Sequence, residues 1–120
     1  MKRFIGQNPD LPLSPAVQCG QMLFLSGQVP VAEDGSIPAG IGPQTDLVLR
    51  KLRAVAREAG YDLVDFVKTT VFLRNMADFD GMNAVYRAYF PANPPARSCV
   101  RAEVAIAADI EIEAVAMKAD

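Results

Sequence analysis

The order of structural elements is clearest around the segment Phe66-Val67-Lys68-Thr69-Thr70-Val71-Phe72-Leu73. Aromatic and β-branched residues predominate in it, and residues of these types favour strands. On either side, the spacing of the apolar residues changes to that of an amphipathic helix. The segment is therefore predicted to be a strand that lies between two helices along the chain.

The first of these helices is predicted over residues 44–59. Pro43 suits the first turn of a helix, and Gly60 suits the residue that follows the last turn. The second helix is predicted over residues 78–90, with Asp78 as its capping residue. Both helices have one apolar stripe, so each is expected to pack against a sheet.

Three more strands are predicted, at 22–28, 98–104 and 110–117, and a turn at Asp34-Gly35 is expected between two extended pieces. Two helices that cover one face of a mixed sheet form an α+β fold. We expect a single domain over residues 1–120. An apolar second face would need a cover, which self-association provides most simply in so small a chain.

The chain has 120 residues, a net charge of −2, 51% hydrophobic residues and no histidine. Without histidine, Ser-His-Asp and Cys-His nucleophilic systems are excluded, and so are the usual imidazole ligands of zinc. The acidic balance disfavours nucleic acid as a partner. Cys19 and Cys99 are too few for a disulfide scaffold and lack metal-ligand spacing.

Other features of the sequence point to a cytoplasmic protein. The chain has no Gly-rich phosphate loop, so a bound nucleotide or flavin is not expected. It has no apolar run of the ~20 residues that a bilayer requires, and its N-terminus lacks the apolar region of a signal peptide. We therefore expect no bound nucleotide or flavin and no membrane contact.

Two segments near the C-terminus carry the chemistry. The first contains Arg97 and Cys99 after a Pro94-Pro95 turn, and the second contains Glu111 and Glu113. Side chains alternate along a strand, so each of these pairs is expected to share a face. If the two segments pair as a hairpin, a guanidinium and a carboxylate converge on one cleft that can hold an organic acid and position a water.

At this point the chain resembles a known family, the Rid family of reactive intermediate (enamine/imine) deaminases, of the RidA/YjgF type. The resemblance runs almost end to end. It rests on Leu25-Ser26-Gly27-Gln28-Val29-Pro30, Gln44-Thr45, Ala59-Gly60, Val67 to Leu73, Asn83-Ala84-Val85-Tyr86, Phe90-Pro91, Pro95-Ala96-Arg97-Ser98 and Ile112-Glu113-Ala114.

The resemblance implies a chorismate-mutase-like α+β fold and a homotrimer with clefts between neighbouring subunits. It also implies the hydrolysis of 2-aminoacrylate and related 2-imino acids to 2-oxo acids and ammonia, without a metal or cofactor. The expected ligands are therefore a small imino acid or its 2-oxo acid product.

By position, the resemblance makes Arg97 the residue that binds the substrate carboxylate and Glu111 the group that orients the attacking water. Cys99 and Asn83 are expected to line the pocket, with Ser26 and Gly27 at its wall.

The chain departs from the family at Leu13, which stands where many active members have a tyrosine that reaches into the neighbour's pocket. This replacement removes a hydroxyl and makes the pocket more apolar.

Simpler roles stay open for several of these residues. Arg97 can pair across a subunit interface, Cys99 can be a buried packing residue, and Asn83 can tie loops together. Glu113 can face the pocket in place of Glu111. At the level of function, the alternative to a deaminase is a non-catalytic trimer that binds a 2-oxo acid or another metabolite. Ribonuclease activity is a third hypothesis, which the acidic composition disfavours.

Overall fold

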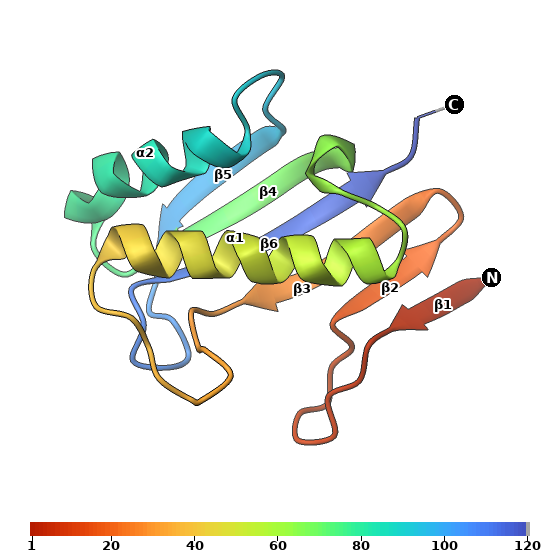
Figure 1. Cartoon of the computed structure of the whole chain (residues 1–120), viewed down its shortest axis with the longest axis horizontal. Helices are drawn as coiled ribbons and strands as arrows, with labels where there is room; N and C mark the ends of the chain where they lie inside the picture. The colour runs from red at the N-terminus through yellow and green to blue at the C-terminus, as the bar shows by residue number, and fades with distance from the viewer. Residues whose placement is uncertain (120) are drawn as a thin grey trace.

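The structure is a computed structural model that describes residues 1–119. Two helices lie across one face of a six-stranded sheet (Figure 1). Along the chain the elements are β1 (Lys2–Ile5), β2 (Ala16–Cys19), β3 (Met22–Gln28), α1 (Ile41–Glu58), β4 (Phe66–Leu73), α2 (Phe79–Tyr89), β5 (Ala96–Arg101) and β6 (Ile110–Met117). The strand order is β1-β2-β3-β6-β4-β5, in which only the β4–β5 pair is parallel. This mixed sheet with two helices on one face confirms the predicted α+β fold class.

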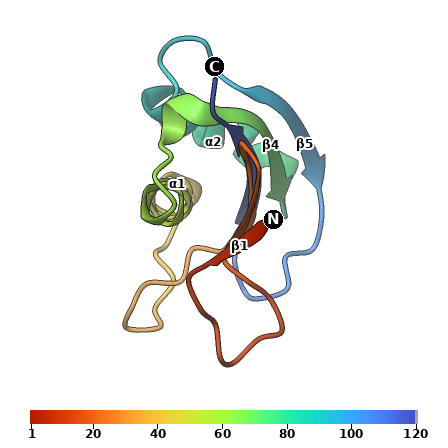
Figure 2. The same cartoon turned by 90° about the vertical axis from the view of Figure 1, so that its right-hand side faces the viewer.

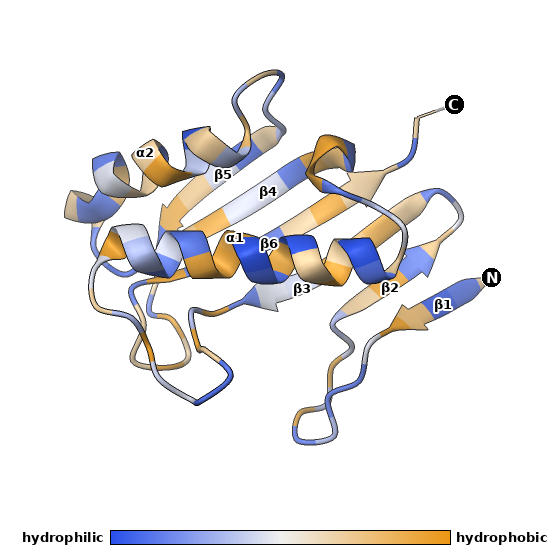
Figure 3. Cartoon of the chain, in the orientation of Figure 1, coloured by the Kyte–Doolittle hydropathy of each residue, from blue (hydrophilic) through white to orange (hydrophobic). Residues whose placement is uncertain are grey.

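The helix α1 forms where the apolar spacing predicted it, beginning three residues earlier. Pro43 lies in its first turn, and the buried stripe includes Val48, Leu49 and Leu52. The chain leaves the helix through Gly60, whose φ of 84° is a conformation that glycine adopts without strain. Figure 3 shows hydrophilic and hydrophobic residues alternating along α1, as expected for a helix with one buried side.

The helix α2 begins after a short 3₁₀ turn, Met76–Asp78, and the prediction that Asp78 caps it with its side chain is wrong. Asp78 precedes the helix but makes no capping hydrogen bond. Asn75 caps the 3₁₀ turn instead, because its Oδ1 accepts from the backbone N–H of Ala77 at 2.9 Å. The capping residue therefore lies one turn earlier in the chain than the helical spacing suggested.

The core lies between the sheet and the two helices. Alternate residues of β6, Ile110 and Ile112 among them, are fully buried there with Val71 and Leu73 of β4. In Figure 2 both helices lie on one side of the curved sheet, and no helix of the described chain covers the other side. We call this uncovered side the open face. It carries several exposed apolar side chains: Phe4, Phe24, Val100 and Met117.

The last two strands do not form the hairpin that sequence analysis considered as one possibility. β5 pairs in parallel with β4 at the edge of the sheet, whereas β6 lies between β3 and β4. The chain leaves β4, crosses through α2 and returns beside β4, which is the usual connection of parallel strands. β6 then pairs on both of its edges, which satisfies more backbone groups than a hairpin with β5 would.

Other differences from the predicted elements are small. β3, β4 and β6 have the predicted bounds, whereas β5 begins two residues earlier and ends three residues earlier than expected. The turn at Asp34-Gly35 is present, because the Oδ1 of Asp34 accepts from the N–H of Ser36 at 3.0 Å. The flanking pieces between Val29 and Ile37 are irregular and form no strands.

Candidate functional site

Arg97 stands on β5 and points to the helix side of the sheet, where α2 holds its guanidinium. Nη1 donates to Oδ1 of Asn83 at 2.7 Å. The guanidinium carbon lies 4.9 Å from the ring centroid of Tyr86 and 5.7 Å from that of Phe79. No carboxylate of residues 1–119 lies within ion-pair distance of Arg97. This half-buried cation is therefore held in place by neutral groups and is not neutralised by them.

The aromatic support under Arg97 is itself fixed. The hydroxyl of Tyr86 shares a buried hydrogen bond of 2.7 Å with Oγ1 of Thr69 on β4. Burial raises the pKa of Tyr86, although the bond to Thr69 opposes this shift. The ring consequently stays neutral and presents a fixed face to the cation, an arrangement that attracts a guanidinium electrostatically.

Cys99 lies two residues after Arg97 on the same side of β5, as alternation predicted. It is half-buried and packs against the core. Burial raises the pKa of its thiol, and the charge of Arg97 offsets this shift only in part. Because a thiol is a much weaker nucleophile than a thiolate, the surroundings of Cys99 favour a packing role.

A small pocket adjoins Arg97 between α2 and the turn that leads into β5. It has a volume of about 260 Å³ and is lined by Asn83, Tyr86, Arg87, Phe90, Pro94, Pro95 and Arg97. We call it the α2–β5 pocket. No acidic residue lines it, so its charged groups are both cations.

Glu111 and Gly27 form a second group of predicted residues, on the open face. A Cβ atom built on Gly27 would meet Oε2 of Glu111 and would lie 3.0 Å from its Cδ. The carboxylate therefore occupies the space that a side chain at position 27 would fill. Burial raises the pKa of Glu111, and the negative charge of Glu113 on the same face adds to this shift.

Ser26 and Leu13 form a third group, in the loop between β1 and β2 and at its anchor. Oγ of Ser26 donates to the carbonyl of Ser14 at 2.6 Å, and its backbone N–H donates to the carbonyl of Pro15 at 3.0 Å. These bonds hold the loop to the end of β3. Leu13 lies in this loop with an exposed side chain, beside the strands farthest from β5.

The predicted site residues thus divide among three places in one chain. Arg97, Asn83 and Cys99 lie together on the helix side of β5, whereas Glu111 and Gly27 lie on the opposite side of the sheet. The convergence of Arg97 and Glu111 that a hairpin would have produced within one chain is therefore not formed. Three strands, β4, β6 and β3, lie between β5 and the β1–β2 pair whose loop carries Leu13.

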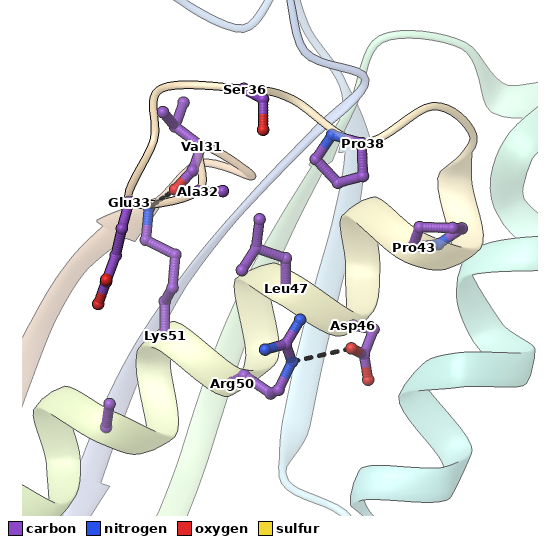
Figure 4. A pocket seen from close by; sticks show the side chains of 11 residues that line it. Val31, Ala32, Glu33, Ser36, Pro38, Pro43, Asp46, Leu47, Arg50 and Lys51 are labelled. Carbon is purple, nitrogen blue, oxygen red and sulfur yellow. Dashed lines mark hydrogen bonds and ion pairs between the residues drawn. The ribbon is translucent and has the colours of Figure 1, made fainter.

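The largest pocket contains none of the predicted residues. It has a volume of about 830 Å³ and lies between α1 and residues 31–38 (Figure 4). Its two cations already have partners, since Nζ of Lys51 donates to the carbonyls of Val29 and Val31 and Nε of Arg50 pairs with Asp46. Arg97 has no carboxylate partner among residues 1–119 and adjoins a pocket with the predicted residue Asn83, so we place the candidate site at Arg97.

The sequence pattern does not identify the groups that support Arg97. Tyr86 and Phe79 lie within the apolar stripe of the second predicted helix, and Thr69 lies within the predicted strand over residues 66–73. One signal was present, because Asn83 and Tyr86 are three residues apart and such residues are neighbours on a helix surface.

Comparison with known proteins places this geometry in a family. Residues 6–118 match the family model described as Endoribonuclease L-PSP. The chain belongs to the YjgF/RidA family. It is 38% identical to the 2-iminobutanoate/2-iminopropanoate deaminase of Escherichia coli over 125 residues, covering 98% of each chain.

Solved structures of the YjgF/RidA family have the same fold. A candidate endoribonuclease of Thermotoga maritima superimposes with a TM-score of 0.94 at 40% identity, with both chains fully covered. Escherichia coli TdcF, solved with bound serine, has a TM-score of 0.92 at 34% identity and covers 98% of this chain and 99% of its own. No helix of the described chain is long and apolar enough to span a membrane.

Proposed function

We propose that the protein is a cytoplasmic homotrimeric enamine/imine deaminase that hydrolyses small 2-imino acids to 2-oxo acids and ammonia. The observation that supports this most directly is the half-buried guanidinium of Arg97. It donates to Asn83 and lies over the ring of Tyr86, and it has no carboxylate partner among residues 1–119. Such a group is suited to the carboxylate of an organic acid. Family membership supports the proposed reaction, because a relative at 38% identity is named 2-iminobutanoate/2-iminopropanoate deaminase.

Arg97 binds the substrate carboxylate in this proposal. Its hydrogen bonds to described residues all use Nη1, so the edge formed by Nε and Nη2 remains for the ligand. A guanidinium edge donates two parallel hydrogen bonds to a carboxylate, which fixes the orientation of the ligand as well as its charge. The imine carbon next to that carboxylate is then held at a defined distance from the protein.

Glu111 orients the water that attacks the imine carbon. The oxygen of the water bonds to this carbon as the C=N π electrons move to nitrogen, and the water proton passes through the carboxylate to that nitrogen. The resulting carbinolamine transfers its hydroxyl proton to the nitrogen, the C–N bond breaks, and ammonia leaves as the C=O bond forms. General acid–base assistance of this kind accounts for roughly 10²–10⁴-fold in rate. Because its pKa is raised, the carboxylate of Glu111 is a stronger base than that of an ordinary glutamate and accepts a proton more readily.

A cleft shared by two subunits brings Arg97 and Glu111 together in this proposal. Within one chain they lie on opposite sides of the sheet, so no rotamer change joins them. The exposed apolar side chains of the open face suit burial against another copy. We infer that β5 of one subunit meets the end of β3 and the Leu13 loop of the next.

Hydrolysis of imines in a coupled assay tests the proposal. An amino-acid oxidase generates 2-imino acids from a panel of amino acids, and semicarbazide competes with the protein for each imine. The wild-type protein should lower semicarbazone formation. Arg97→Ala should lose about a hundredfold or more in kcat/KM, because two charge-assisted hydrogen bonds are lost. Arg57→Ala, which removes an exposed arginine of α1, serves as the matched control and should behave as wild type.

An Arg97→Ala protein that keeps its oligomeric state and its activity would remove the anchor role from Arg97. Absence of activity in the wild-type protein across the whole panel would favour a second function, a metabolite-binding module. The bound serine in TdcF favours this alternative, because a structural relative was solved with an amino acid bound to it. Binding of a 2-oxo acid without imine hydrolysis would then identify the protein as such a module.

A further inference from the structure

Arg87 is a second cation in the α2–β5 pocket, and the proposed reaction does not use it. It lies one helical turn after Asn83, whose side chain holds Arg97. Residues four apart on a helix have Cβ atoms about 5–6 Å apart. Arg87 on α2 and Arg97 on β5 therefore both line one small pocket.

The charges of this pocket are not balanced by the protein. No residue among the seven that line it is acidic, and neither arginine has a carboxylate within ion-pair distance among residues 1–119. Most other arginines on the helices differ in this respect, since Arg50 pairs with Asp46 and Arg57 with Asp62. Two adjacent like charges repel each other, and a bound anion relieves this repulsion.

The walls of the pocket limit the ligand to a short chain. Tyr86, Phe90, Pro94 and Pro95 provide apolar surface between the two cations. The volume of about 260 Å³ is below the ~300–1,000 Å³ of pockets that hold drug-sized ligands. A ligand with one acidic group at each end and a few carbons between them fits both the charges and the size.

We propose that the α2–β5 pocket selects dicarboxylates, with Arg97 binding the carboxylate next to the reacting carbon and Arg87 binding the distal one. This inference rests on the proposed deaminase function and narrows its substrates to imines of acidic amino acids. The reaction is unchanged: water adds to the C=N carbon, ammonia leaves, and a 2-oxo dicarboxylate forms.

Binding of the product class by titration calorimetry tests the inference without requiring turnover. The ligands are 2-oxoglutarate, which is a dicarboxylate, and 2-oxobutanoate, which has one carboxylate. The wild-type protein should bind 2-oxoglutarate about tenfold more tightly, the gain expected from one additional hydrogen-bonded charge. Arg87→Gln should lose this advantage and keep its affinity for 2-oxobutanoate within about twofold.

Two controls separate a specific contact from general attraction. Arg57→Gln removes the same charge from the surface of α1, away from the pocket, and should retain the preference for 2-oxoglutarate. Arg97→Ala should weaken both ligands, because both use this anchor. A wild-type protein that binds the two ligands equally, or an Arg87→Gln variant that weakens both equally, would overturn the inference.

Failure of the proposed function gives a different result. A preference for 2-oxoglutarate that depends on Arg87, without hydrolysis of any imine in the coupled assay, would support the dicarboxylate site and reject the deaminase. Hydrolysis of imines with no preference for dicarboxylates would support the deaminase and reject the dicarboxylate site.

Discussion

Gly27 and Glu111 show how a single missing side chain makes room for a functional group. The carboxylate of Glu111 lies where a Cβ on Gly27 would be, and the backbone of Gly27 has an ordinary negative φ. An alanine at position 27 is therefore compatible with the backbone but not with the observed position of the carboxylate. A substitution at position 27 can therefore displace the carboxylate of Glu111 without destabilising the fold.

Gly27→Ala should lower kcat by about tenfold or more while changing the free energy of unfolding by less than about 1 kcal/mol. The flexible end of Glu111 moves aside at little cost, but it no longer orients the water. Steady-state kinetics and chemical denaturation check the two expectations separately. A normal kcat in this variant would show that Glu111 does not act from its present position.

Glu113→Gln should move the acid limb of the rate profile to lower pH. The negative charge of Glu113 raises the pKa of Glu111, so its removal lets Glu111 ionise at lower pH. The water-orienting form of Glu111 is the ionised one, and activity should then persist further into the acid range. The measurement is kcat against pH for both proteins, and an unshifted limb would assign it to another group.

Sequence alternation predicted which site residues share a face, and the structure confirms it for Arg97 with Cys99 and for Glu111 with Glu113. It could not predict that the two pairs lie on opposite sides of the sheet. That depends on which strands pair, and the pairing of β5 with β4 follows from the crossover through α2, which no local pattern encodes.

At the level of elements, a hydrogen bond joins the two helices. The hydroxyl of Tyr89 on α2 donates to Oδ1 of Asp46 on α1. Burial and the neighbouring carboxylate raise the pKa of Tyr89 to about 12. The same bond holds the pKa of Asp46 below its ordinary value. A group with a lowered pKa in the folded state stabilises the protein above its unfolded pKa and loses this effect as pH falls through the folded pKa.

Tyr89→Phe should lower the free energy of unfolding at pH 7 by about 1 kcal/mol, a value reduced for the partial exposure of Asp46. The difference from wild type should shrink as pH falls below about 4, the ordinary pKa of aspartate, because Asp46 then becomes protonated. Denaturation at several pH values checks this. Tyr61→Phe is the control, since Tyr61 donates to the backbone carbonyl of Gln21 and its loss should not depend on pH in this range.

The elements that sequence patterns predicted well are those with a long buried stripe. Both helices and the strands β3, β4 and β6 contribute many apolar residues to the core, and their periodicity is therefore clear. β1 and β2 have four residues each and were not predicted. A strand of this length has too few alternations to distinguish it from a loop, and only pairing with a neighbouring strand, β2 for β1 and β3 for β2, orders it.

For the whole molecule, the open face and the divided site point to the same arrangement. The proposed ring of three copies would bury the exposed apolar residues of the sheet and would bring Arg97 of one copy near Glu111 of the next. Such a ring would have a mass of three times 12.9 kDa, which analytical ultracentrifugation measures directly.

Co-expression of Arg97→Ala with Glu111→Gln should restore activity that each variant lacks alone. When each cleft takes Arg97 from one chain and Glu111 from the next, equal amounts of the two variants leave about a quarter of the clefts intact. The expected activity is therefore about a quarter of wild type. No recovery in verified mixed oligomers of two variants that are each inactive alone would mean that both residues act within the same chain.

If the open face joins the subunits, catalytic activity would depend on the concentration of the protein. When a working cleft needs two chains, a diluted protein loses activity faster than it loses molecules, because dissociation removes clefts and leaves every chain folded but incomplete. Halving expression of the gene would then reduce clearance of its substrate by more than half near the dissociation threshold. Through the association of its apolar surface, the expression level of the protein would in this way control the rate at which its substrate is removed.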